Sequence, residues 1–170
     1  MIDELDLPVL LASREGPVRL RGAMRDDVDA IIALLSDDPV SAGRGDVAAA
    51  EDRGLYQRGL VRILASESND LLVVESDDLV VATMQLTVIP GMARRGSTRL
   101  LVEAVRVAQA WRSQGVGSAI MRWVADVAAP SVGATVVQLT SDAARTDAHR
   151  FYTRLGFVDS HVGFKLVLPS

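Results

Sequence analysis

The chain has 170 residues, of which 49% are apolar and 24% are charged, a length and composition typical of one soluble globular domain. A net charge of -4 and a pI near 5.1 argue against binding of nucleic acid or of an acidic membrane surface. The chain lacks cysteine, which excludes disulfides, thiolate metal sites and cysteine nucleophiles, and its two histidines are too few to suggest a metal site.

The first 17 residues leave two interpretations open. They carry a few apolar side chains around Leu7 and end at Gly16-Pro17, so they form either an arm without fixed structure or an added edge element. We expect residues 18–170 to form a single domain. The start of the chain lacks the basic stretch of a secretion signal, and no apolar run is long enough to span a membrane, so we expect a cytoplasmic location.

The segment from residue 18 to residue 89 contains both strand and helix patterns. Apolar residues spaced three and four apart predict helices, and alternating or β-branched runs predict strands. Asp26 or Asp27 precedes the first apolar stripe and suits an N-cap. The predicted elements are a strand over 18–24, helices over 27–36 and 46–66, and strands over 71–75 and 79–89 joined by an acidic turn.

The stretch over 99–127 has the pattern of a strand, a glycine-containing turn and a helix. The turn holds Gly115 and Gly117, and apolar residues recur at helical spacing from Val116. The first N–H groups of a helix have no intrahelical acceptor and the helix dipole favours negative charge there, so this turn suits a phosphate group. Arg112, at the start of the loop, offers a charge-assisted hydrogen bond.

The two glycines of this turn could serve more than one role. The simplest is that glycine serves only the geometry of a strand-to-helix connection. A nucleotide-binding P-loop requires lysine after its last glycine, whereas Ser118 follows Gly117. A dinucleotide-binding fingerprint requires a third glycine where this chain has Ile120. Both nucleotide motifs are therefore excluded, while the simple turn remains open.

The C-terminal part of the chain predicts a strand, a helix and a closing strand. Residues 135–140 are rich in β-branched side chains. Thr146 or Asp147 suits the N-cap of a helix that ends near Leu155. The closing strand is predicted from alternating apolar residues, Val162, Phe164, Leu166 and Leu168. This order of elements predicts an α/β layered fold around a mixed sheet.

Two motifs resemble those of the GNAT superfamily of N-acetyltransferases. The run Arg112-Ser113-Gln114-Gly115-Val116-Gly117 is similar to the family's acetyl-CoA motif, Arg/Gln-x-x-Gly-x-Gly/Ala. The run AHRFYTRLGF over 148–157 is similar to the family's A-x-x-F-Y-x-x-L-G-F. The resemblance extends from residue 18 onward. It implies the GNAT fold, with a mixed, mostly antiparallel sheet of six or seven strands flanked by about four helices.

The resemblance implies that acetyl-CoA is a co-substrate and that no metal takes part. The strand Val105-Arg106-Val107 is expected to hold the pantetheine arm, through the backbone of Val105 and Val107. The pyrophosphate is expected to bind the backbone N–H groups of Gln114, Gly115, Val116, Gly117 and Ser118. Arg145 stands where the family often has asparagine, so its guanidinium is expected either to bind a CoA phosphate or to face water.

Acetyl transfer from a thioester to an amine requires aligned reactants, removal of a proton from the ammonium and protonation of the thiolate. Glu103 is the candidate base, because strand alternation predicts a face shared with Val105 and Val107, where apolar neighbours would raise its pKa. A structural pairing with Arg99 is the alternative. Tyr152 matches the family tyrosine that protonates or holds the thiolate, and a role in the core is its alternative.

These observations predict an N-acetyltransferase that moves the acetyl group of acetyl-CoA directly to a primary amine. A non-catalytic acyl-CoA-binding or sensing domain of the same fold is the alternative. The acceptor itself is not identified by the sequence, and family members commonly dimerise, so a homodimer is an expectation. In the family, the region of the second predicted helix lies beside the acceptor site, and its candidates for contact with the amine are Arg53, Tyr56, Arg58 and Arg62.

Overall fold

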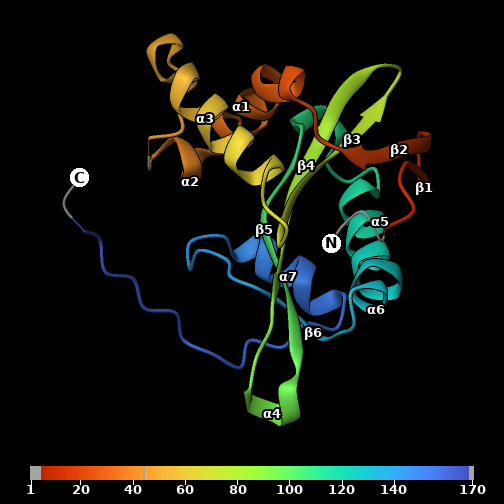
Figure 1. The fold of residues 1–170 in the computed structure, drawn as a ribbon. Helices are drawn as coiled ribbons and strands as arrows, with labels where there is room; N and C mark the ends of the chain where they lie inside the picture. The colour runs from red at the N-terminus through yellow and green to blue at the C-terminus, as the bar shows by residue number, and fades with distance from the viewer. Residues whose placement is uncertain (1–4, 44, 169–170) are drawn as a thin grey trace.

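The computed structural model describes residues 5–43 and 45–168, which contain one six-stranded sheet with helices around it (Figure 1). The strands are β1 (Val9–Ser13), β2 (Gly16–Gly22), β3 (Asn69–Ser76), β4 (Leu79–Ile89), β5 (Thr98–Val107) and β6 (Ala134–Leu139). They lie in sequence order across the sheet. Only β5 and β6 are parallel neighbours. This mixed, mostly antiparallel sheet confirms the predicted fold class.

Helices cover both faces of the sheet (Figure 1). The helices are α1 (Val28–Ser36), α2 (Pro39–Ala42), α3 (Arg53–Leu64), α4 (Ala93–Gly96) at the tip of the β4–β5 hairpin, α5 (Val116–Trp123), α6 (Ala129–Ser131) and α7 (Thr146–Arg154), with 3-10 turns over 25–27, 50–52 and 109–111 and a π turn over 124–128. α1 and α3 pack on one face, where Ile32 and Leu60 join Leu71 and Val73 in a small core. α5 and α6 cover the other face. No helix in these described ranges is long and apolar enough to cross a membrane.

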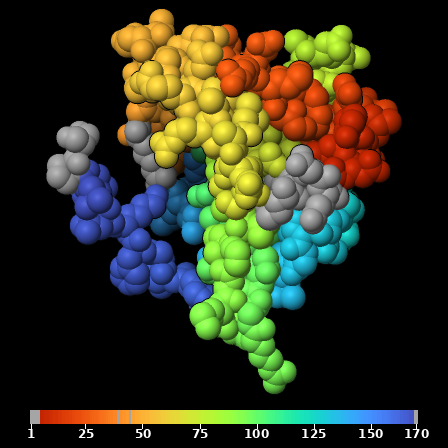
Figure 2. Space-filling model, viewed as in Figure 1, coloured from red at the N-terminus to blue at the C-terminus, as the bar shows by residue number. Residues whose placement is uncertain are grey.

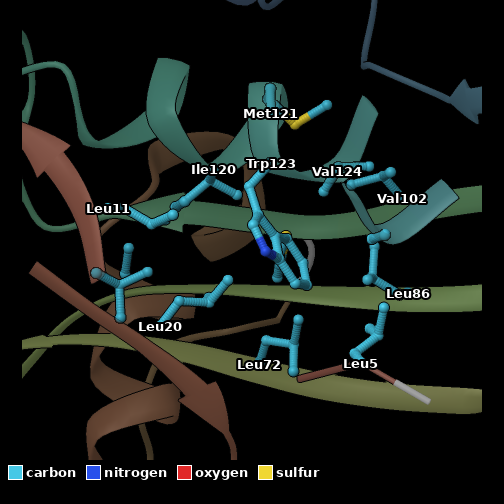
Figure 3. Close-up of a cluster of buried hydrophobic side chains, with 14 of the residues drawn as sticks. Leu5, Leu11, Leu20, Leu72, Leu86, Val102, Ile120, Met121, Trp123 and Val124 are labelled. Carbon is cyan, nitrogen blue, oxygen red and sulfur yellow. The ribbon is translucent and has the colours of Figure 1, made fainter. Parts of the chain in front are cut away.

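The centre of the sheet is buried on both faces, which explains why β3 has a continuous apolar run. Residues 71–74 of β3 are all buried, because α1 and α3 cover one face and α5 the other. Figure 3 shows the larger core, in which α5 directs Ile120 and Trp123 toward Leu20 and Leu72 of the sheet. Full burial of each such leucine stabilises the fold by about 1.5–3 kcal/mol.

The N-terminal segment is an edge element of the sheet, one of the two interpretations that the sequence left open. β1 pairs antiparallel with β2, in a register that runs from Val9 opposite Leu20 to Ser13 opposite Gly16. Leu11 is buried in the larger core. The folded domain therefore begins before residue 18, the start that was expected from the sequence.

The predicted closing strand over 162–168 is wrong. Residues 158–168 have no regular secondary structure, and the segment extends away from the sheet (Figure 1). Phe164 is 92% exposed and Val162 is 80% exposed. Apolar alternation indicates that a segment can pair as a strand, but it does not specify an edge with which the segment pairs. Phe157, which packs partly against the larger core, is the last residue before this exposed tail.

A charged network joins β2, β3 and the start of α1. Arg21 donates two hydrogen bonds to the Asp27 carboxylate, at 2.8 and 2.9 Å, and a third from Nε to Glu75 at 2.6 Å. Burial tends to raise the pKa of Asp27, but the hydrogen bonds from Arg21 and from the Met24 N–H outweigh it and lower the pKa. The Asp27 and Glu75 carboxylates in turn raise the pKa of Arg21.

Candidate active site

The loop between β5 and α5 leaves backbone donors free at a helix N-terminus. Gly115 adopts the left-handed conformation, with φ of 89°, and precedes the first residue of α5. The N–H of Ala119 donates to the Gly115 carbonyl at 2.9 Å and makes the first bond of this helix. The N–H groups of Val116, Gly117 and Ser118 therefore have no acceptor within the helix. This arrangement fits an anion such as a pyrophosphate.

Gly117 lies against the helix that carries the second motif. A Cβ at this position would lie 3.4 Å from Cζ of Phe151 in α7 and 3.8 Å from the Val107 side chain. Gly115 suits its left-handed backbone conformation, whereas a Cβ at Gly117 would be in van der Waals contact with the Phe151 ring. The glycine loop and α7 are therefore in direct contact, although the sequence separates their motifs by a strand.

Three hydrogen bonds, two from Arg112 and one from Arg14, fix the glycine loop to the rest of the domain. The Arg112 guanidinium donates from Nε to the Val107 carbonyl at 3.0 Å and from Nη2 to the Asp37 carboxylate at 2.8 Å. The Arg14 N–H in the β1–β2 turn donates to the Gln114 carbonyl at 2.8 Å. The side chain of Arg112 thus fastens the loop to the end of α1, and the N-terminal hairpin supports the same loop from another side.

A β-bulge in β5 corrects the predicted orientation of Glu103. Ala104 has a φ of 50°, and the β4–β5 register shifts here, so that alternation is interrupted. Val105 and Val107 consequently pack against the larger core. The predicted face shared by Glu103 with these valines is therefore wrong, and so are its predicted apolar surroundings, because Glu103 is exposed and opposite Gln85.

A pocket of about 320 Å³ lies between α1, α3 and the sheet. Its lining is mainly apolar: Val28, Ile31, Ile32, Leu35, Leu55, Tyr56, Gly59, Leu60, Ile63, Leu71, Thr83, Gln85 and Ala104. Gln85, the cross-strand neighbour of Glu103, is part of the lining, so Glu103 projects from the same face of the sheet as this pocket. We call it the α1–α3 pocket.

The second predicted helix is shorter than expected, and Asp46 is not its cap. It begins with the turn over 50–52, and the Asp46 carboxylate instead accepts a hydrogen bond of 2.7 Å from the Tyr56 hydroxyl. This bond and burial raise the pKa of Tyr56 to about 12. Tyr56 lines the α1–α3 pocket. Three of the four candidates on this helix are not part of the pocket lining: Arg53, which pairs with Asp29, and the exposed Arg58 and Arg62.

Tyr152 lies in an aromatic group at the end of α7. Its ring packs edge-on against Phe151 and Phe157, with ring centroids 5.1 and 5.8 Å away. Burial raises the pKa of Tyr152, and the positive charges of Arg106 and Arg145 oppose that shift. The hydroxyl is therefore protonated at neutral pH and lies within the electrostatic reach of two arginines.

These two arginines meet at α2 in a group that the sequence did not predict. Arg106 donates to Ser41 Oγ at 2.6 Å, and Arg145 pairs with the Asp38 carboxylate and reaches Ser41 Oγ at 3.4 Å. We call Asp38, Ser41, Arg106 and Arg145 the arginine cluster. The sequence predicted only that the helix over 27–36 ends before Asp38, because contacts between residues more than 60 positions apart leave no local pattern.

Comparison with known proteins identifies relatives of this chain. A family model described as "Acetyltransferase (GNAT) family" matches residues 29–157. A transcriptional regulator from Bacillus halodurans has a solved structure that is 33% identical, with a TM-score of 0.83 over 89% of this chain and 99% of that chain. The structure of glucosamine-6-phosphate N-acetyltransferase from Arabidopsis thaliana has a TM-score of 0.70 at 17% identity, over 89% of this chain and 99% of that one.

A curated relative matches a shorter stretch of the chain. Aminoalkylphosphonate N-acetyltransferase from Salmonella typhimurium is 40% identical over 57 residues, which is 34% of this chain and 36% of that protein. The chain thus matches about a third of this relative's length.

Proposed function

The chain belongs to the GNAT acetyltransferase family, and from this premise we propose that it transfers the acetyl group of acetyl-CoA directly to a primary amine. The observation that carries the proposal is the contact between Gly117, at the donor-rich start of α5, and Phe151, the neighbour of Tyr152 on α7. This contact brings the start of α5, where we propose that an anion binds, close to the helix that carries the partly buried Tyr152, whose hydroxyl is protonated at neutral pH. A transfer from an anionic thioester needs both groups in one place.

The donor is proposed to bind along the glycine loop and β5. The N–H groups of Val116, Gly117 and Ser118, with that of Gly115, would hold the pyrophosphate. The Gln114 N–H, also expected to take part, instead donates to the Trp111 carbonyl at 3.4 Å. The backbone of Val105 and Val107 would pair with the pantetheine arm, and Arg106 between them projects its side chain elsewhere. The side chain of Arg112 already binds Asp37, so its contribution is to position the loop.

The proposed chemistry needs one acid and one base and no covalent enzyme intermediate. Tyr152 would donate its proton, or a hydrogen bond, to the departing thiolate, a role that its raised pKa favours because the hydroxyl is protonated at the working pH. Glu103 would remove a proton from the ammonium through water, since its side chain is exposed on the face that carries the α1–α3 pocket. The amine would then attack the thioester carbonyl, and the C–S bond would break.

The acceptor is proposed to occupy the α1–α3 pocket, whose apolar lining suits a small amine with an aliphatic or aromatic body. The match to an aminoalkylphosphonate N-acetyltransferase supports a small amine as acceptor. A cytoplasmic location, where acetyl-CoA is available, completes this proposal.

Release of CoA thiol from acetyl-CoA, measured across a panel of small amines, tests the proposed function. We expect thiol release that depends on an added amine. The similarity to a transcriptional regulator from Bacillus halodurans makes a non-catalytic acyl-CoA-binding or sensing domain the second candidate. Tight acetyl-CoA binding in calorimetry without thiol release on any amine of the panel would favour that second candidate.

Replacing Glu103 with glutamine is expected to lower kcat/KM about a hundredfold at pH 7, within the range for loss of a general base. The loss should shrink as the pH approaches the pKa of the amine, because a neutral amine needs no base. Arg99→Gln, at another exposed position of β5, serves as the matched control. A loss that stays constant from pH 7 to pH 10 would contradict the assignment of Glu103 as the base.

We also propose that the chain forms a homodimer in which the tail of each copy packs on the other. Two observations support it: Phe164 and Leu166 of the tail are exposed and alternate as in a strand, and β6 pairs with β5 alone among the described residues. Light scattering should give twice the 18.2 kDa of one chain, and Phe164→Ser with Leu166→Ser should give one chain. Met92→Ser, at an exposed hairpin tip, should remain dimeric. A monomeric wild type would contradict the proposal.

A further inference from the structure

The arginine cluster lies beside the α1–α3 pocket. Arg106 is the cross-strand partner of Thr83, which lines the pocket, and therefore projects from the same face of the sheet. A polar path joins the two: Tyr56 in the lining donates to Asp46, the Asp46 N–H donates to the Ser41 carbonyl, and Ser41 Oγ accepts from Arg106. Figure 2 shows α2 and α3 gathered on one side of the molecule, above the exposed tail.

The positive charge of the cluster is incompletely compensated. Among the described residues, one carboxylate, that of Asp38, lies within 4 Å of these guanidinium groups. Arg106 and Arg145 share it. Asp46 lies farther away and is held by Tyr56. The side chains of Arg106 and Arg145 are only 18% and 20% exposed, so water screens their mutual repulsion poorly.

Two further features agree with a missing counter-charge. Burial and the like charge of Arg145 lower the pKa of Arg106, whereas nearby carboxylates raise the pKa of Arg21 and of Arg53. The Nε atom of Arg106 is also buried without a hydrogen-bond partner. A buried guanidinium donor without an acceptor is costly, and a bound anion would supply that acceptor.

We propose that Arg106 and Arg145 form an anion subsite for the acceptor, which selects amines that carry a carboxylate or phosphonate near the amino group. This proposal rests on the proposed function, in which the second substrate is an amine that accepts the acetyl group. The positive charges of both arginines reach the Tyr152 hydroxyl, beside which the thioester sulfur is expected. An anion held by the two arginines would therefore lie close to the reacting amine. The rest of such an acceptor would enter the apolar α1–α3 pocket. An aliphatic α-amino acid or its phosphonate analogue has this chemistry.

Calorimetry on the full chain saturated with CoA tests the subsite with three probes of one shape. The probes are L-leucine, 1-amino-3-methylbutylphosphonate and 3-methylbutylamine, which lacks the anionic group. We expect both anionic probes to bind more tightly than 3-methylbutylamine, and the tighter of the two identifies the preferred anion. Arg106→Gln should weaken both anionic probes about tenfold to a hundredfold, the loss expected for charge-assisted hydrogen bonds, and should change 3-methylbutylamine less than about twofold.

Matched variants separate this subsite from donor binding and from the proposed function. Arg106→Lys should keep part of the selectivity, and Arg99→Gln on the same strand should keep all of it. Equal or undetectable binding of the three probes to wild type, or weaker CoA binding in Arg106→Gln, would overturn the subsite. Acetylation of amines without preference for an anion would overturn the subsite but support the transferase. Anion-selective binding without acetylation would support the subsite and contradict the transferase.

Discussion

Replacing Tyr152 with phenylalanine is expected to lower kcat for acetyl transfer about a hundredfold, at the lower end of the effect of a general acid. The thiolate would leave without a proton donor, while the phenyl ring would preserve packing against Phe151 and Phe157. We therefore expect the Kd for acetyl-CoA and the thermal stability to change little. Steady-state thiol release at saturating acetyl-CoA measures this effect.

The expected loss is specific to the hydroxyl of Tyr152. Thr153→Val removes a hydroxyl from the next residue of the same helix, where it donates to the His149 carbonyl at 2.9 Å, and should leave kcat within about twofold of wild type. Because the pKa of Tyr152 is raised above its usual value of about 10, the wild-type rate should not fall between pH 7 and pH 9 through loss of this proton. A kcat for Tyr152→Phe within twofold of wild type would show that the thiolate leaves without this hydroxyl.

Replacing Gly117 with valine is expected to weaken acetyl-CoA binding tenfold or more. The new Cβ would lie 3.4 Å from the Phe151 ring, and its two methyl groups would force the loop and α7 apart. Overpacking of this kind costs about 1–3 kcal/mol, which corresponds to roughly tenfold to a hundredfold if it displaces the free N–H groups from the donor. Calorimetric titration with CoA measures the affinity directly.

A second glycine provides the control for that substitution. Gly22→Val adds the same side chain in β2, at a position where a Cβ meets no atom within 4 Å, and should leave CoA affinity unchanged. Thermal denaturation of both variants separates lost binding from lost folding. An unchanged Kd for CoA in a folded Gly117→Val protein would contradict the role of this helix N-terminus.

Much of the fold follows from patterns within short stretches of sequence. The limits of β4 agree with the predicted strand over 79–89, and α1 and α7 begin within a residue of their predicted starts. The predicted capping is wrong, because Asp27 makes no side-chain cap bond to α1 and the N-cap of α7 is Arg145. The left-handed Gly115 and the helix after it also follow from the sequence, because glycine is favoured where φ is positive. Such features depend on local periodicity and turn chemistry, which a single sequence contains.

The features that were missed depend on contacts or on backbone irregularity. Strand alternation cannot reveal the bulge at Ala104, so the face of Glu103 was predicted wrongly. The arginine cluster joins α2, β5 and α7, which only the folded chain brings together. Residues 162–168 of the tail have the pattern of a strand but no partner strand among the described residues. The bulge and the arginine cluster depend on contacts between segments that are distant in the sequence. The tail has no partner segment among the described residues.

The fate of a labelled acetyl group tests direct transfer most directly. The protein would be incubated with acetyl-CoA labelled with carbon-13 in its acetyl group, with and without an amine that supports thiol release, and all products would be analysed by mass spectrometry. We predict one labelled amide for each CoA thiol released, and a protein whose mass stays unchanged when the amine is withheld. Labelled acetyl bound to the protein, or released only as acetate, would contradict direct transfer to an amine.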